Sequence, residues 1–271
     1  MSRIENTLLA LKENGKTALI PYITAGDPHP DLTVGLMHTL VENGADIIEL
    51  GVPFSDPMAD GPVIQKAVER ALIHNVSLTN VLAMVKKFRE SNLSTPIVLM
   101  GYLNPIEAKG YVDFAEEAMQ AGVDGVLTVD MPPEETKGYL EALKEHGLDR
   151  IFLVAPTTPD YRLDEVNRLG SGFVYYVSLK GVTGSKNLDF EEVSQKINHL
   201  KEKLNLPIGI GFGIKNAETA KKMSQVGDGI IVGSALVQLI EDNELAGKDA
   251  IEQAISSKMQ TFKTAIQSKE S

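Results

Sequence analysis

The stretch Ala45-Asp46-Ile47-Ile48-Glu49-Leu50-Gly51 decides the fold. It is a short and nearly continuous apolar run, which is typical of a strand buried on both faces of a parallel sheet. A proline-rich loop follows it, and the amphipathic pattern over Val63–His74 then predicts a helix. Strand, turn and helix in this order form the unit from which parallel α/β folds are built.

The same unit recurs along the chain. Strand-like runs lie at Ala18–Thr24, Asp46–Leu50, Pro96–Met100, Gly125–Val129, Ile151–Val154, Phe173–Val177, Pro207–Ile210 and Gly229–Val232. Helical patterns lie between them, as at Asp31–Asn43, Val63–His74, Tyr111–Ala121, Pro133–His146, Asp189–Leu204 and Ala217–Val226. About eight such units predict an α/β fold, a single (β/α)8 TIM barrel spanning residues 1–271 as one domain.

Extra helices are expected around this repeat. The N-terminus reads as a short amphipathic helix whose apolar positions are Ile4, Leu8, Leu9 and Leu11. A second helical pattern, Leu78–Ser91, precedes the third strand, and Ala246–Ile266 predicts a terminal helix. A short helix over Ser234–Ile240 directly follows the eighth strand, where such barrels often present a helix N-terminus to a phosphate.

Composition limits the function. No run of about 18 apolar residues predicts a membrane span, and without a recognisable export signal we expect a cytoplasmic protein. Cys is absent, which excludes disulfides and thiolate catalysis. The net charge of −11 argues against a nucleic-acid partner, and the 5 His residues lack metal-ligand spacing, so no metal site is expected.

Glu49 is the first candidate for chemistry. The active site of such a barrel lies at the C-terminal ends of the strands, and Glu49 stands near that end, among Ile48, Leu50 and Val52. One interpretation is a structural ion pair or an exposed edge position. The other is a carboxyl group whose pKa is raised by desolvation, so that it exchanges a proton near neutral pH.

The loop Val52–Pro62 carries two further carboxylates, Asp56 and Asp60, among three prolines. The prolines limit its conformations and would help to hold a carboxylate over the barrel mouth. Equally, Asp60 would cap the helix that opens at Pro62. Spacing alone leaves both interpretations open.

Glycines near the ends of the last strands predict an anion site. Gly209–Gly213 follows strand seven, and Gly233-Ser234 follows strand eight. Their backbone N–H groups could approach a phosphate closely, whereas the spacing does not fit a dinucleotide fingerprint. Leu179–Asn187, with two glycines and two lysines, would be either a mobile lid or an ordinary surface loop.

Several motifs together match one known family in register. They are Pro21–Pro28, Glu49–Gln65, Gly101–Pro105, Asp130–Glu135, Gly181–Gly184, Gly211–Gly213 and Gly233–Ala235. Through them the sequence resembles the tryptophan synthase α subunit family over nearly its whole length. That family's fold is the same barrel, and its reaction is the retro-aldol cleavage of indole-3-glycerol phosphate to indole and glyceraldehyde 3-phosphate.

The resemblance implies a role for each matching residue. Glu49 would protonate the indole ring and then take the hydroxyl proton, and Asp60 would hold the indole N–H. The implied phosphate ligands are Gly184, Gly213, Gly233 and Ser234. The implied indole pocket and lid are Tyr22, Tyr102, Leu127, Tyr175, Thr183 and Phe212. Because Tyr176 adjoins Tyr175, the choice of tyrosine rests on strand alternation.

The resemblance also implies a partner. A β subunit that carries pyridoxal phosphate would complete an α2β2 heterotetramer, with the loop around Pro53 and Asp56 facing it, and this subunit would need no cofactor of its own. The motifs leave open a stand-alone lyase with the same residues and a non-catalytic regulatory subunit that only binds the phosphate ligand. Another phosphate-handling barrel, such as an isomerase, would give no reason for the Pro53–Pro62 block.

Overall fold

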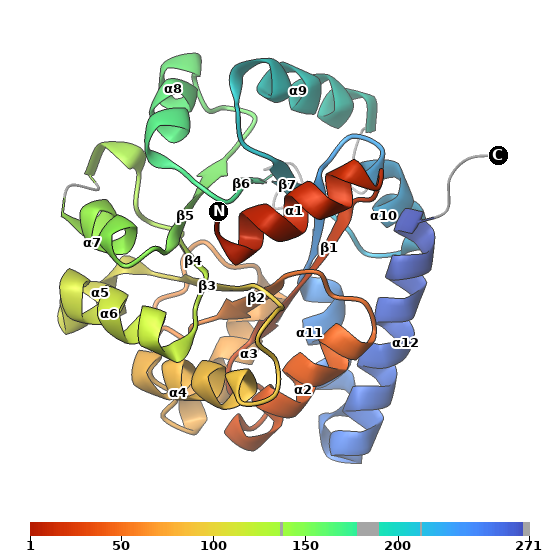
Figure 1. The fold of residues 1–271 in the computed structure, drawn as a ribbon. Coiled ribbons are helices and arrows are strands. Elements are labelled where there is room, and N and C mark those ends of the chain that lie inside the picture. Colours follow the sequence, from red (N-terminus) through yellow and green to blue (C-terminus); the bar gives the residue numbers. More distant parts are fainter. Residues whose placement is uncertain (136–137, 178–189, 212, 268–271) are drawn as a thin grey trace.

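A computed structural model describes residues 1–135, 138–177, 190–211 and 213–267 (Figure 1). Parallel strands close a barrel in chain order, and β8 pairs with β1 to complete it. The strands are β1 (Ala18–Thr24), β2 (Ile48–Gly51), β3 (Ile97–Gly101), β4 (Gly125–Thr128), β5 (Asp149–Val154), β6 (Val174–Tyr176), β7 (Ile208–Ile210) and β8 (Gly229–Val232). The predicted eight-stranded barrel is therefore confirmed.

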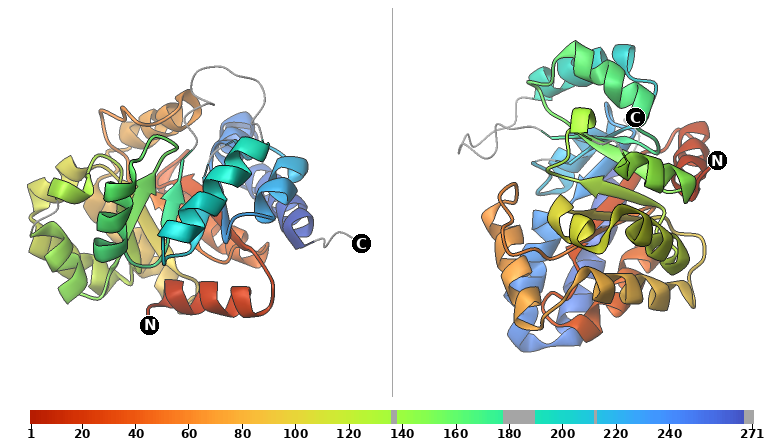
Figure 2. Two further views of the ribbon diagram at one scale, coloured as in Figure 1. Left: turned by 90° about the horizontal axis from the view of Figure 1, so that it is seen from above. Right: turned by 90° about the vertical axis from the view of Figure 1, so that its left-hand side faces the viewer.

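Helices surround the barrel, as the two further views show (Figure 2). In the first half of the chain they are α1 (Arg3–Glu13), α2 (Pro30–Glu42), α3 (Pro62–Ile73), α4 (Leu78–Arg89), α5 (Leu103–Lys109) and α6 (Tyr111–Ala121). In the second half they are η1 (Pro133–Glu135), α7 (Tyr139–Glu145), α8 (Asp160–Leu169), α9 (Phe190–Lys203), α10 (Ala217–Ser224), α11 (Ser234–Asn243), η3 (Glu244–Ala246) and α12 (Lys248–Gln267).

The core has two layers, which explains why the strands are apolar on both faces. Inside the barrel, alternate strand residues such as Ile20, Val98 and Leu127 form one buried cluster. The residues between them, such as Leu50 and Leu99, face the surrounding helices in a larger cluster. Side chains alternate across a strand, so a position on β2 must face either the barrel interior or the helices.

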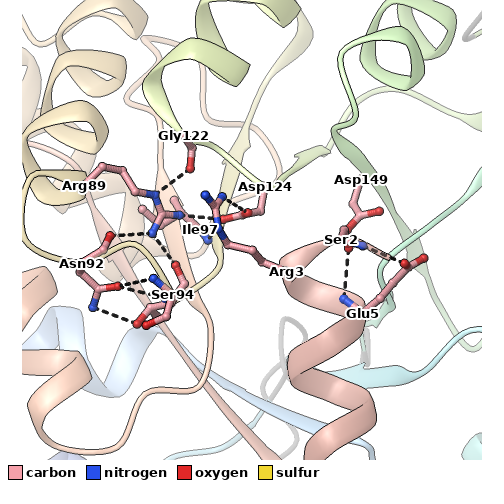
Figure 3. A network of polar contacts seen from close by, with 11 residues as sticks. Ser2, Arg3, Glu5, Arg89, Asn92, Ser94, Ile97, Gly122, Asp124 and Asp149 are labelled. Atoms are coloured by element: carbon pink, nitrogen blue, oxygen red, sulfur yellow. Dashed lines mark hydrogen bonds and ion pairs between the residues drawn. The ribbon is translucent and has the colours of Figure 1, made fainter.

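Helix α1 covers the N-terminal end of the barrel, opposite the ends where a site is expected. Ile4 and Leu8 are buried in the inner cluster, whereas Leu9 remains 42% exposed. Polar contacts hold the helix in place (Figure 3): Arg3 pairs with buried Asp124 at 2.7 Å, and Ser2 donates to Asp149. Only two of the four apolar positions expected to bury are therefore fully buried.

Asp124 is the centre of this network because it accepts from three donors. The guanidinium groups of Arg3 and Arg89 and the backbone N–H of Ile97 each lie 2.7 Å from its carboxylate (Figure 3). Arg89 also donates to backbone carbonyls, including that of Gly122 at 2.9 Å. Oδ1 accepts from Arg3, and Oδ2 accepts from Arg89 and from the Ile97 amide, so both oxygens of this buried carboxylate are satisfied. The cluster therefore stabilises the N-terminal end of the barrel.

Three helices differ from the sequence expectation. The pattern Pro133–His146 predicted one helix, but the described part divides into η1 and α7, and Gly138 precedes α7 with φ of 87°. Helix α5 was not among the helical patterns named from the sequence; Pro105 stands in its first turn, where proline is tolerated because its missing N–H has no partner to lose. Helix α8, also not among those patterns, buries Leu163 and Val166.

Candidate active site

Glu49 lies inside the barrel. In β2 it pairs in register with Tyr22 of β1 and Val98 of β3, and it is 1% exposed. Neither carboxylate oxygen has a hydrogen-bond partner within the described part of the chain, so those residues form no structural ion pair with it. Burial, and then the nearby charge of Asp60, raise the pKa of Glu49 to about 8. The group is therefore protonated at neutral pH and exchanges its proton slightly above it.

Asp60 is positioned by a tyrosine from the next loop. The Tyr102 hydroxyl donates to Asp60 Oδ2 at 3.0 Å and accepts the backbone N–H of Ala59 at the same distance. Gln65, on the first turn of α3, donates to the Asp60 carbonyl at 2.8 Å. The helix cap at this end is Gly61, which makes no side-chain cap bond, so the interpretation of Asp60 as a cap is wrong.

The two carboxyl groups influence each other. The negative charge of Asp60 contributes to the raised pKa of Glu49. Burial also raises the pKa of Asp60 itself, while the bond from Tyr102 lowers it. A hydrogen bond to the ionised form opposes desolvation at Asp60, and Glu49 has no such donor among the described residues. The pKa of both groups is therefore raised by burial, but only at Asp60 does a hydrogen bond to the ionised form oppose that effect.

Tyr22 of β1 and Tyr175 of β6 are the two buried tyrosines near Glu49. Each ring lies against a glycine of the next strand or its end: a Cβ on Gly51 would stand 2.2 Å from the Tyr22 hydroxyl, and one on Gly211 would stand 2.0 Å from the Tyr175 ring. The Tyr22 hydroxyl contacts Thr24 at 3.1 Å, and that of Tyr175 donates to the Gly211 carbonyl at 3.3 Å. Glycine is required at both positions because the tyrosine rings occupy the space of a side chain.

Strand alternation separates the two neighbouring tyrosines. Tyr175 belongs to the inner cluster with Leu127, and its pKa is raised by burial and then by the charge of Glu49. Tyr176 lies in the outer cluster, against the helices. The structure thus brings Tyr22, Leu127 and Tyr175 to the interior around Glu49, with Tyr102 at its rim beside Asp60.

The residues expected around the phosphate are partly described. Gly213 has φ of 76°, a conformation that favours glycine. Gly233 precedes α11, and the first amides bonded within that turn are those of Leu236 and Val237, which donate to the Gly233 carbonyl. The backbone N–H groups of Ser234 and Ala235 stand ahead of them at the helix N-terminus, where helices bind anions.

Three of the residues expected in the site, Thr183, Gly184 and Phe212, lie outside the described residues, as does the whole of the expected lid Leu179–Asn187. Of the partner-facing loop, Pro53 is buried and Asp56 is exposed, bonded by Ser55 at 2.6 Å. Sequence reasoning gave no separate role to Gln65, which holds the Asp60 carbonyl, or to Thr24. The sequence around a single polar residue in a helix or a strand does not indicate which residue its side chain will contact.

No group of three or more His, Cys, Asp or Glu side chains among the described residues could hold a metal ion. None of the helices in the described ranges is long and apolar enough to cross a membrane.

Comparison with known proteins identifies the family. Residues 8–267 match the family model described as tryptophan synthase alpha chain. The chain is 66% identical to the tryptophan synthase alpha chain of Hydrogenovibrio crunogenus and 58% identical to that of Marinobacter nauticus, covering 98% and 99% of each pair of chains.

Solved structures agree with this assignment. The crystal structure of tryptophan synthase subunit alpha from Legionella pneumophila str. Paris has a TM-score of 0.93 and 48% identity over 98% of both chains. A chain of tryptophan synthase from M. tuberculosis has a TM-score of 0.87 and 34% identity over 98% of this chain and 99% of its own. The chain therefore belongs to the tryptophan synthase alpha chain family and is a lyase of tryptophan biosynthesis.

Proposed function

We propose that Glu49 and Asp60 carry the cleavage of indole-3-glycerol phosphate in this chain. The observation that supports this most strongly is the pair itself. A fully buried acid, unpartnered within the described residues and with a pKa of about 8, is influenced by the charge of a second carboxyl group, Asp60, whose ionised form accepts a hydrogen bond from Tyr102. Such a pair divides acid and anion roles between two residues of the same type.

The first step is protonation of the substrate's ring. Protonated Glu49 gives its proton to C3 of the indole, and the ring nitrogen takes on positive charge as the iminium. Asp60 accepts a hydrogen bond from the ring N–H and stabilises that charge. Asp60 Oδ2, which accepts from the Tyr102 hydroxyl in this structure, would accept from the ring N–H when substrate is bound.

The second step breaks the carbon–carbon bond. The Glu49 carboxylate takes the proton of the side-chain hydroxyl next to the ring, and the carbonyl of glyceraldehyde 3-phosphate forms as the bond to C3 breaks. The bonding electrons return to the ring and neutralise the iminium, so indole leaves with the proton on C3. Glu49 ends the cycle protonated, as it began, which a general acid–base group of balanced pKa permits.

The remaining side chains bind and orient. Tyr22, Tyr102, Leu127 and Tyr175 line the indole end, and backbone N–H groups at Gly213, Gly233 and Ser234 bind the phosphate. Thr183, Gly184 and Phe212, outside the described residues, would complete the pocket and its lid. The reaction consists of proton transfers in a desolvated site, so the subunit works without an organic cofactor of its own.

The β subunit is the partner that the family implies, and pyridoxal phosphate belongs to that subunit. We place the contact at loop 53–60 and the assembly at α2β2. Met58 is 78% exposed beside buried Pro53, and the Phe54 ring lies 5.4 Å from the Tyr102 ring that holds Asp60.

Docking on this loop would order Asp60, so a substrate analogue should bind more tightly with the partner present, and the partner more tightly with the analogue by the same factor. Equal analogue affinity at zero and saturating β subunit, with full lyase activity in the isolated chain, would favour a stand-alone lyase.

Glu49→Gln tests the catalytic assignment. The variant keeps the shape of the side chain and removes its proton, so we expect kcat to fall by roughly 10²–10⁴-fold with substrate binding largely kept. Retention of more than about a tenth of the wild-type kcat would rule out Glu49 as the proton carrier. If both Glu49→Gln and Asp60→Asn left turnover unchanged in the assembled enzyme, the non-catalytic regulatory subunit would be the better description.

A further inference from the structure

A buried ion pair lies beside the proposed site but outside it. Asp27, in the loop after β1, has a side chain that is fully buried, and Arg70 of α3 meets it with two hydrogen bonds. The distances are 2.6 Å from Nε to Oδ1 and 3.1 Å from Nη2 to Oδ2. The guanidinium is 14% exposed and also faces Glu241 of α11, whose Oε2 lies 3.7 Å from Nη1.

Arg70 thus contacts acidic groups from two other elements at once. Burial raises the pKa of Asp27, and the Arg70 bonds and charge lower it. A buried carboxylate without its partner is costly, and the planar guanidinium meets it side-on while a third nitrogen remains for Glu241. A lysine keeps the charge but cannot hold this geometry. Lys66, one turn earlier on α3, makes a second and more exposed contact to Glu241 at 3.0 Å.

The elements joined at Arg70 lead to opposite ends of the proposed substrate. Helix α3 begins two residues after Asp60, and its Gln65 holds the Asp60 carbonyl. Helix α11 begins at Ser234, where the phosphate would bind. The loop of Asp27 follows β1, which carries Tyr22. Arg70 is therefore a polar link between the indole end and the phosphate end of the site.

The apolar contacts between the same elements are less directional than the ion pair. Ala67 of α3, Val237 of α11 and Tyr22 form a small buried cluster, and α3 and α11 pack against each other. Apolar packing is non-directional and tolerates small sliding, whereas a bidentate ion pair is satisfied in one arrangement only. Buried ionic contacts are best attested in this role of setting register.

We infer that Arg70 is a positioning residue, which through Asp27 and Glu241 sets the distance and orientation between the Asp60 end and the Ser234 end of the site. The inference rests on the proposed function, in which one substrate spans both ends. A substrate that binds at both ends needs Asp60 and Ser234 at the right distance from each other. A misplacement of reacting groups by about 1 Å can cost about 10²-fold in rate. Indole alone and a small phosphate ligand alone do not need that register.

The test compares spanning and single-end ligands in the full chain with its β subunit. Arg70→Lys keeps the charge beside Asp27 but loses the bidentate hydrogen bond. Glu241→Gln keeps that bond and removes the ion pair between Arg70 and α11. We expect kcat/KM for indole-3-glycerol phosphate to fall about tenfold in Arg70→Lys and about threefold in Glu241→Gln, mainly through kcat. Binding of indole and of sn-glycerol 3-phosphate, each measured alone, should stay within about twofold of wild type.

Lys66→Gln is the matched control, because it removes an ion pair to the same Glu241 without touching Arg70. It should leave kcat/KM within about twofold of wild type. Wild-type kcat/KM in both Arg70→Lys and Glu241→Gln would overturn the inference, and so would a loss of single-end binding as large as the loss in kcat/KM. If Arg70→Lys fails to fold, Glu241→Gln decides alone. A wild-type protein that bound no sn-glycerol 3-phosphate would instead refute the phosphate site, and with it the premise.

Discussion

The hydroxyl of Tyr102 bridges two residues of the loop before α3, accepting from the Ala59 amide and donating to the Asp60 carboxylate, both at 3.0 Å. One side chain therefore holds both the backbone and the charged end of a loop that lies outside regular secondary structure. The same bond favours the ionised form of Asp60, against a burial that raises its pKa. An aromatic residue expected only to line a pocket thus has a polar function as well.

Tyr102→Phe should lower activity through this contact. The ring and its packing remain, but the loop loses two hydrogen bonds, so we expect kcat/KM to fall about twofold to tenfold. Steady-state kinetics measure the effect, and Tyr161→Phe, which changes a tyrosine 63% exposed on α8, is the matched control. An activity equal to that of the control would show that the Tyr102 hydroxyl does not position Asp60.

The pH profile of kcat/KM should fall on its alkaline side near the pKa of Glu49. The first step needs protonated Glu49, and burial together with the Asp60 charge raises that pKa to about 8. Activity is therefore present below this pH and lost as Glu49 ionises above it. In Asp60→Asn the residual activity should fall at a lower pH, since one cause of the raised pKa is removed. An alkaline limb at the same pH in this variant would contradict the coupling of the two groups.

The same raised pKa affects stability, with a defined sign. Between its ordinary value of 4.5 and about 8, the folded state holds a proton on Glu49 that the unfolded state has released. Stability should therefore decline as pH rises through this interval. Glu49→Gln cannot ionise, so its urea midpoint relative to wild type should be higher at pH about 9 than at pH about 5.

Ser234→Asp should weaken binding at the phosphate end of the site without affecting binding at the indole end. An aspartate at the first position of α11 suits the helix N-terminus and should preserve the fold, but its charge repels a phosphate at the same place. We expect sn-glycerol 3-phosphate and substrate affinities to fall at least about tenfold, with indole affinity unchanged. Ser234→Asn, similar in size and neutral, is the control for both titrations. Equal losses for indole and phosphate ligand would place the anion elsewhere.

Local patterns in the sequence determined the barrel and the place of its acid. Strand runs such as Asp46–Leu50 are apolar because both of their faces are covered, and this is visible without knowledge of the neighbours. The position of Glu49 near the end of such a run made it a candidate for chemistry, but whether it is buried or exposed was left open. The helical patterns named from the sequence did not include α5 and α8.

Tertiary structure alone decided which residues meet. Tyr102 and Asp60 are 42 positions apart, and Arg70 and Asp27 are 43 apart, so no periodicity relates them. It also decided that Asp60 is held by a tyrosine rather than capping α3, and that Gly51 and Gly211 provide space for rings from other strands. The physical reason is that local backbone preferences fix strands and helices. Which distant residues form a hydrogen bond or ion pair depends on the closure of the barrel, because closure brings their elements together.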